Sequence, residues 1–181
     1  AFADILSGKV NPSGKLADTW AYKYEDYPSS EKFSHNNGNV ETELYDEGIY
    51  VGYRYFDTFE VPVRYGFGYG LSYTDFEITG CALKAVSAEK IRVTATVRNT
   101  GNVSGKDVVQ VYASLPGGIL EKEAHRLAAY AKTNELKPGE AQEVTMEVKM
   151  DGLTSYDEKR AAWILESGFY GIWVGNSLAS A

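Results

Sequence analysis

The sequence predicts a mainly β fold, in which a β-sandwich from about residue 75 onward follows the end of an α/β unit. Three observations predict it. Segments that alternate apolar and polar residues begin near Asp75, turn residues separate them, and the first 74 residues lack this pattern. We therefore expect two parts, residues 1–74 and residues 75–181.

The first part opens like the end of an α/β unit. Residues 1–6 resemble the last turns of a helix, and Gly8 stands where a C-cap is expected. We expect this helix to be truncated, with more of a larger protein before it. Asn-Pro-Ser-Gly at 11–14 predicts a turn, and residues 15–20 predict a short strand. Residues 21–40 are polar and rich in turn residues, which predicts a long loop.

The stretch from residue 45 to residue 73 is dense in tyrosine, glycine and charge. Its first half, GIYVGYRYFD (48–57), is rich in the aromatic and β-branched residues that favour a strand. In its second half, Gly66, Gly68 and Gly70 alternate with aromatic residues, so we expect the backbone to turn tightly and approach its neighbours closely where rings pack. We expect this stretch to be a covered joint between the two parts, with the following rings packed inside it: Phe67, Tyr69 and Tyr73.

The second part contains about seven short segments with strand patterns, as expected for a sandwich of immunoglobulin or fibronectin III type. The alternation is clearest in IRVTATVRN (91–99) and EVTMEVKM (143–150), each with one apolar face. Residues 108–114 form another candidate strand. Two closing strands flank Ser167-Gly168 and offer these side chains to the core: Trp163, Leu165, Tyr170, Ile172 and Val174.

Two features of the second part are less clear from the residues alone. The segment EKEAHRLAAYAKTNEL (121–136) is ambiguous, because its Ala, Leu, Lys and Glu content favours a helix. Cys81 has no His or Lys nearby in sequence to activate it, so we interpret it as a half-buried strand thiol. A single cysteine cannot form an internal disulfide and leaves the redox compartment open.

Composition excludes several classes of partner. The 181 residues carry a net charge of −7 and no stripe of Lys or Arg, which argues against binding to nucleic acid. No apolar run approaches the roughly 20 residues of a membrane-spanning helix. Apolar residues make up 44% of the chain, enough for a packed core. Neutral partners are therefore favoured.

Several motifs follow one another along the chain. The first three are SGKVNPSGKLADTW (7–20), EGIYVGYRYFD (47–57) and YGFGYGLSYTDFEI (65–78). They resemble the end of the α/β sandwich domain in glycoside hydrolase family 3, the β-glucosidase and β-xylosidase group. Five later motifs resemble the fibronectin type III-like domain of the same family: VRNTG, GKDVVQVYAS, LKPGE, LTSYD and GFYGIWVGNS. The resemblance implies a strand at residues 126–132, and it makes residues 21–40 a candidate rim of a sugar site.

The resemblance also implies where the chemistry lies. Retaining glycoside hydrolysis needs two carboxyl groups about 5–5.5 Å apart. In this family the nucleophilic aspartate belongs to a barrel domain and the acid/base glutamate to a loop before residue 1, so no catalytic residue is assigned here. The intact protein would hydrolyse terminal β-linked sugars, with this part bracing the catalytic domains. We expect no metal and no cofactor, and substrate-binding residues remain unknown, as does the compartment.

Four side chains are candidate site residues. Asp46 and Glu47 are adjacent carboxylates with Arg54 nearby, but on a strand they would point to opposite faces, so we interpret them as a salt-bridging or loop-fixing feature. His35 has no second ligand beside it, and we do not expect it to bind metal. We expect His125 to have a surface or interface role. The alternative function is a stand-alone carbohydrate- or protein-binding β-sandwich module, which a solvent-exposed aromatic platform would favour.

Overall fold

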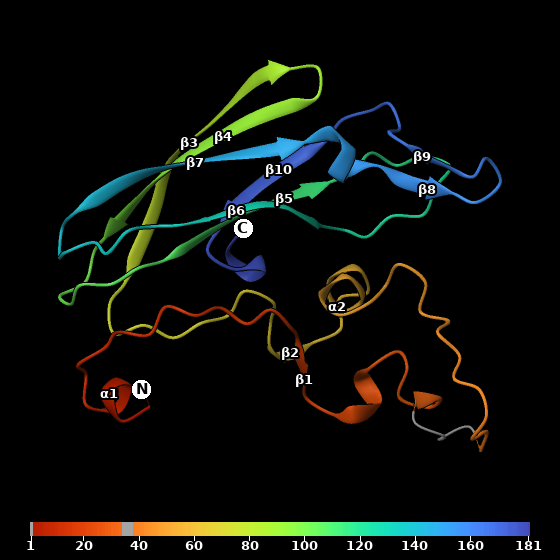
Figure 1. The fold of residues 1–181 in the computed structure, drawn as a ribbon, viewed down its shortest axis with the longest axis horizontal. Helices are drawn as coiled ribbons and strands as arrows, with labels where there is room; N and C mark the ends of the chain where they lie inside the picture. Colours follow the sequence, from red (N-terminus) through yellow and green to blue (C-terminus); the bar gives the residue numbers. More distant parts are fainter. Residues whose placement is uncertain (1, 34–37) are drawn as a thin grey trace.

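The computed structural model describes residues 2–33 and 38–181, and it confirms the mainly β fold. Figure 1 shows a two-layer sandwich formed by the later part of the chain, with the N-terminal residues running along one side of it. The first sheet has the order β3 (Phe76–Ser87), β4 (Lys90–Asn99) and β7 (Ala141–Lys149). The second has the order β10 (Gly171–Gly175), β5 (Val108–Ser114) and β6 (Arg126–Lys132).

Smaller elements complete the sandwich. The 3₁₀ turn η3 (Met150–Leu153) follows β7 and leads into a hairpin of β8 (Ser155–Asp157) and β9 (Ala162–Ile164). A second 3₁₀ turn, η4 (Leu178–Ser180), follows β10. All strand pairs within the described residues of the sandwich are antiparallel.

The core lies between the two sheets because alternate residues of each strand point inward. Val93 of β4 is fully buried and lies opposite Met146 of β7, and Ala95 lies opposite Val144. Inward residues of β5, such as Val111, close the core from the other sheet. The alternation predicted for residues 91–99 and 143–150 is therefore confirmed.

The ambiguous segment 121–136 forms a strand where the resemblance implied one. β6 pairs with β5 in antiparallel register: Lys132 lies opposite Val108 at one end, and Arg126 lies opposite Ala113 at the other. Its helix-favouring residues adopt the extended conformation because ladder hydrogen bonds and packing on the core outweigh a propensity of a few tenths of a kcal/mol per residue.

The N-terminal segment contains α1 (Phe2–Leu6), β1 (Trp20–Ala21), η1 (Tyr24–Asp26), α2 (Tyr53–Thr58) and β2 (Val63–Tyr65). The predicted C-cap is confirmed: Gly8 has φ of 74° and its N–H donates to Ile5 O at 2.9 Å. The strand predicted at residues 15–20 is wrong except for Trp20, which begins β1. Leu16 instead exchanges backbone hydrogen bonds with Gly68 and Tyr69 outside any ladder.

The strand expected in residues 48–57 is also wrong, because its second half forms α2. Gly52 adopts φ of 59° and lets the chain turn into the helix. Helical spacing then directs Phe56 inward, where it is only 4% exposed and packs edge-on against Tyr27 with ring centroids 5.4 Å apart. Aromatic packing thus overrides the strand propensity of these residues.

Three side-chain predictions for the sandwich need correction. Trp163 and Leu165 are exposed rather than part of the core, because they belong to or follow the β8–β9 hairpin outside the two main sheets. Cys81 lies in a strand as expected but is exposed. A register shift between Thr79 and Ala82 disrupts the ladder there, and the rest of β3 is exposed. Tyr170, Ile172 and Val174 do pack against the core.

Candidate functional site: the joint between the N-terminal segment and the sandwich

The joint is the contact of α2 and residues 63–73 with the outer face of β5 and β10 and with the loop at 115–125. Tyr112 of β5 lies at its centre and is fully buried. The Tyr53 ring of α2 packs edge-on against Tyr112, with ring centroids 6.2 Å apart, and lies at a tilt of 37° against Phe67, with centroids 4.6 Å apart. Leu127 N–H donates to Tyr53 Oη at 2.9 Å. Burial raises the pKa of the Tyr112 hydroxyl, which therefore stays neutral.

Close backbone approach at the joint depends on Gly68. Its φ of 79° lies in the left-handed region, and a Cβ there would lie 2.6 Å from the side-chain amide of Gln110. That amide is held in place, since Gln110 Oε1 accepts a hydrogen bond from Tyr112 Oη. A Cβ on Gly70 would meet Gly14 O at 2.5 Å. Close approach was predicted for Gly66, Gly68 and Gly70. It is confirmed for Gly68 and Gly70 and wrong for Gly66, where a Cβ would meet only Val63 Cγ2 at 3.9 Å.

The ring predictions have mixed outcomes. Phe67 is half-buried at the joint, as predicted. Tyr69 and Tyr73 remain substantially exposed. Tyr69 packs on Tyr65 within the N-terminal segment, and Tyr73 Oη donates to Ile5 O at 2.8 Å. These two rings therefore stabilise the segment itself rather than its contact with the sandwich.

A buried carboxylate joins α2 to the start of β6. Arg126 donates to both oxygens of Glu123, from Nε at 2.7 Å and from Nη2 at 3.0 Å. Arg54 of α2 approaches the same carboxylate at 3.4 Å. Burial alone would raise the pKa of Glu123, but the hydrogen bonds from Arg126 and the two positive charges lower it below its usual value. Glu123 is thus ionised and shared by the two parts.

Two further contacts lie beside this carboxylate. His125 Nδ1 is 2.9 Å from Asp57 Oδ2, and the imidazole packs edge-on against Trp173 at 5.4 Å. Ala124 N–H donates to Thr58 Oγ1 at 2.9 Å. His125 has the interface role expected for it, in which its ring holds the end of α2 against the second sheet.

A second polar anchor lies at the start of β5. Lys15 Nζ is 3.0 Å from Asp107 Oδ1, and Asn176 Nδ2 donates to the other oxygen of that carboxylate at 3.0 Å. Asn11 Nδ2 donates to Ser104 O, also at 3.0 Å. Sequence reasoning missed this anchor. The partners lie about ninety residues apart in sequence, and no local motif links them.

The carboxylate pair weighed from the sequence does not form a site. Residues 46 and 47 lie in an irregular segment, so the strand geometry assumed for this pair is wrong. Asp46 forms an ion pair with Lys32, and the hydrogen bond from Lys32 lowers the pKa of the Asp46 carboxyl. Asp46 therefore has the salt-bridging role expected of it. His35 lies outside the described residues.

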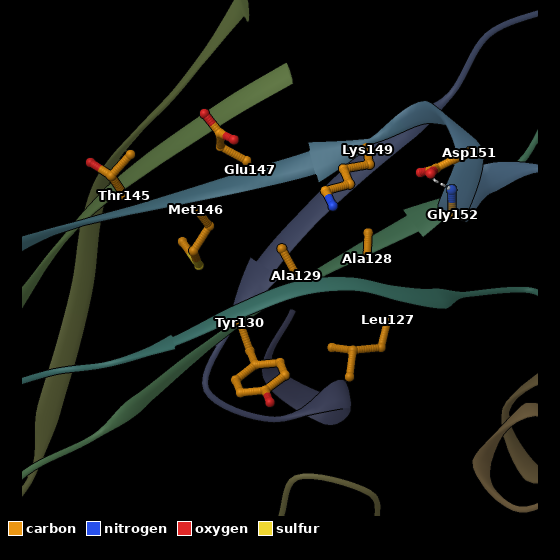
Figure 2. A pocket seen from close by; sticks show the side chains of 10 residues that line it. All are labelled: Leu127, Ala128, Ala129, Tyr130, Thr145, Met146, Glu147, Lys149, Asp151 and Gly152. Carbon is orange, nitrogen blue, oxygen red and sulfur yellow. Dashed lines mark hydrogen bonds between the residues drawn. The ribbon is translucent and has the colours of Figure 1, made fainter. Parts of the chain in front are cut away.

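An open hollow of about 520 Å³ runs along the sandwich edge between β6 and β7. Figure 2 shows Ala128 and Ala129 of β6 on the side of that strand that faces β7, with Met146 and Lys149 of β7 pointing toward them. Its carboxylates are engaged: Glu147 pairs with Lys90, and Asp151 accepts from Gly152 N–H.

Among residues 2–33 and 38–181, no three His, Cys, Asp or Glu side chains gather closely enough to hold a metal ion. No helix in the same residues is long and apolar enough to span a bilayer.

Comparison with known families decides the identity of the chain. Residues 1–53 match the glycosyl hydrolase family 3 C-terminal domain, and residues 107–178 match a fibronectin type III-like domain. The chain is 46% identical to β-glucosidase A of Butyrivibrio fibrisolvens over 98% of its own length. The chain belongs to glycoside hydrolase family 3.

Solved family 3 structures share this fold. The structure superposes on β-glucosidase 3B of Thermotoga neapolitana with a TM-score of 0.91 and 42% identity, covering 99% of this chain and 25% of that one. An exo-α-(1→6)-L-arabinopyranosidase of Bifidobacterium breve is 41% identical. The chain spans about a quarter of its relatives' length, 24% of the Butyrivibrio enzyme and 23% of the Bifidobacterium enzyme. Residues 54–106, which include most of α2, lie between the two matched domains.

Proposed function

We propose that the chain is the accessory part of a family 3 glycoside hydrolase that cleaves terminal β-linked sugars from oligosaccharides or glycosides. Its task is to brace the catalytic domains, which are other parts of the same polypeptide. The observation that carries the proposal is the joint, in which buried rings and the Glu123 carboxylate fix the N-terminal segment to the sandwich. Such a joint fixes the positions of the two parts relative to each other and takes no part in catalysis.

The catalytic nucleophile and the acid/base lie outside this chain. Carboxylates at the joint are engaged by other side chains: Glu123 by Arg126, Asp57 by His125 and Asp107 by Lys15. A nucleophile needs a free carboxylate facing a sugar, with a second carboxyl about 5–5.5 Å away. These residues fit a structural role instead, and we assign none of them to catalysis or to substrate binding.

The boundary between the two parts falls between residues 74 and 75. Thr74 is buried, and its Oγ1 donates to Asn99 Oδ1 at 2.7 Å. The last residue of the first part therefore packs against the end of β4. β3 begins at Phe76. The sandwich then needs no residue before 75 to complete its two main sheets.

Activity measurements on the chain alone test the proposal. We expect no turnover of aryl β-glucosides or aryl β-xylosides, whereas the intact polypeptide hydrolyses at least one of them. Glu47→Gln is the matched control in both proteins and should change neither result. Turnover by the chain alone that disappears in Glu47→Gln would contradict both the accessory role and the interpretation of this residue.

A further inference from the structure

The β8–β9 hairpin carries an exposed pair of aromatic rings. Tyr156 of β8 lies directly opposite Trp163 of β9, with ring centroids 5.3 Å apart and planes inclined at 62°. Trp163 is 69% exposed and Tyr156 is 48% exposed. The neighbouring pair, Ser155 and Ile164, points to the opposite face, where Ser155 is buried. Both rings therefore share the outer face of the hairpin, at one end of the sandwich (Figure 1).

The hairpin turn is held by its own polar groups. Asp157 Oδ1 accepts from Lys159 N–H at 2.9 Å and from Arg160 N–H at 3.3 Å, and Arg160 Nε lies 3.5 Å from Asp157 Oδ2. The turn does not depend on burial of the rings, because they are mostly exposed. A rigid turn positions the rings before any ligand arrives, which reduces the entropy lost on binding.

Trp163 is the most exposed of the three tryptophans, at 69% against 54% for Trp20 and 46% for Trp173. Trp173 lies against His125 at the joint, and its Nε1–H donates to Ser114 Oγ. Trp20 packs edge-on against Tyr65 in the β1–β2 ribbon. Trp163 contacts only the ring of Tyr156 among the aromatic neighbours in the described chain. Large exposed rings held outside a core are typical of binding surfaces.

The charge around the rings favours an uncharged ligand. Residues 155–164 contain two acidic and two basic side chains and are neutral, although the whole chain carries −7. A charged partner such as nucleic acid binds a surface of opposite net charge, and this hairpin has no net charge. A β-linked glucopyranose unit carries all its ring substituents in equatorial positions, so its hydroxyls lie at the rim and its faces consist of C–H bonds, which are complementary to an aromatic ring.

We propose that Tyr156 and Trp163 form a glycan-binding surface that takes the C–H faces of a neutral β-linked glucan. The two inclined rings contact successive sugars of a twisted chain, and hydroxyls at the sugar rim meet the Tyr156 hydroxyl and the charged turn. The proposal goes beyond the bracing function and does not depend on it, since binding is measured without turnover.

Affinity electrophoresis of the complete 181-residue chain in gels containing barley β-glucan tests this surface. We expect retardation of the wild type and about tenfold weaker binding of Trp163→Ala, the loss expected when an anchoring ring is truncated. Tyr156→Ala should weaken binding, Trp163→Phe should retain part of it, and Trp20→Ala, the matched control, should bind like the wild type. Titration with cellohexaose should shift tryptophan emission in the wild type and not in Trp163→Ala.

Two results would overturn the proposal. The first is a wild-type chain that neither slows in β-glucan nor changes its emission, or a Trp163→Ala variant that binds as well as the wild type. The second is concentration-dependent self-association that Trp163→Ala abolishes, which would identify the rings as a protein contact. Circular dichroism of each variant shows whether it is folded, and Trp163→Phe tests the ring if Trp163→Ala unfolds.

Discussion

Replacing Arg126 by alanine should destabilise the chain more than any exposed charge substitution. Arg126 is hydrogen-bonded to both oxygens of Glu123, and its Nη1 donates to Thr154 O at 2.6 Å. The Glu123 side chain is 1% exposed. The substitution therefore leaves a buried carboxylate with Arg54 as its remaining cationic partner, at 3.4 Å.

The size of the effect follows from this geometry. Removing one partner of a buried ion pair costs about 3–5 kcal/mol. Because Arg54 still approaches the carboxylate, we expect the lower end, about 3 kcal/mol of unfolding free energy. The charge-neutral double variant Glu123→Gln/Arg126→Met should recover most of that loss, since replacing a buried pair as a whole is often neutral.

Urea unfolding followed by tryptophan fluorescence at pH 7 measures this free energy. Arg160→Ala is the matched control, because Arg160 also pairs with an acidic residue three positions earlier, Asp157, but is 66% exposed. It should cost about 0.5 kcal/mol or less. Equal losses for the two arginine variants, or a double variant as unstable as Arg126→Ala, would refute the reasoning.

The same carboxylate predicts a pH dependence. The pKa of Glu123 is lowered in the folded state, so the unfolded state binds its proton more readily. Its contribution to stability is complete above the ordinary glutamate pKa of about 4.3 and is lost as the pH falls through the lower folded value. The stability difference between wild type and Glu123→Gln should therefore be largest near neutral pH and shrink below about pH 4.

Three more predictions concern the joint and the sandwich. Gly68→Ala should lower the free energy of unfolding by more than the roughly 1–2 kcal/mol of left-handed strain, because its Cβ meets Gln110. Gly48 is the matched control, since it also has a positive φ but has open space around it. Gly48→Ala should therefore show the strain alone in urea unfolding. Phe67→Ala should cost about 2 kcal/mol, less than a fully buried ring, and reduce hydrogen-exchange protection of residues 45–73; unchanged protection would show that the ring does not organise the joint. Limited proteolysis should leave residues 75–176 intact, and a resistant core ending near Leu115 would contradict the proposed boundary.

The sandwich strands could be predicted because their signal is local. A strand with one face in the core must alternate residue by residue, and β4 and β7 do so over most of their length. β6 could not be predicted in this way, since its alanines suit a helix and its conformation depends on pairing with β5. The resemblance to family 3 supplied what the residues did not.

The joint was predicted in place but not in detail. Density of tyrosine and glycine marked it, and Gly68 has the close contact expected of it. The conformation of residues 53–58 was missed, because a short aromatic run fits either a strand or a helix and only distant partners decide. Those partners, such as Tyr112 and Leu127, lie more than fifty residues away in sequence.

The two polar anchors explain how a segment with little regular structure is held firmly. β5 and β6 are antiparallel, so the anchor at Asp107, before β5, and the anchor at Glu123, before β6, lie at opposite ends of the same sheet. The part of β5 that pairs with β6 runs from Val108 to Ala113, and its five residue-to-residue steps span about 17 Å. Tyr112 and Gln110 lie between them and pack against Tyr53 and Gly68. One anchor would allow the N-terminal segment to rotate over the sheet, whereas two anchors with buried rings between them oppose both rotation and sliding. Loss of one anchor should therefore loosen the nearer end of the segment and leave the other end protected.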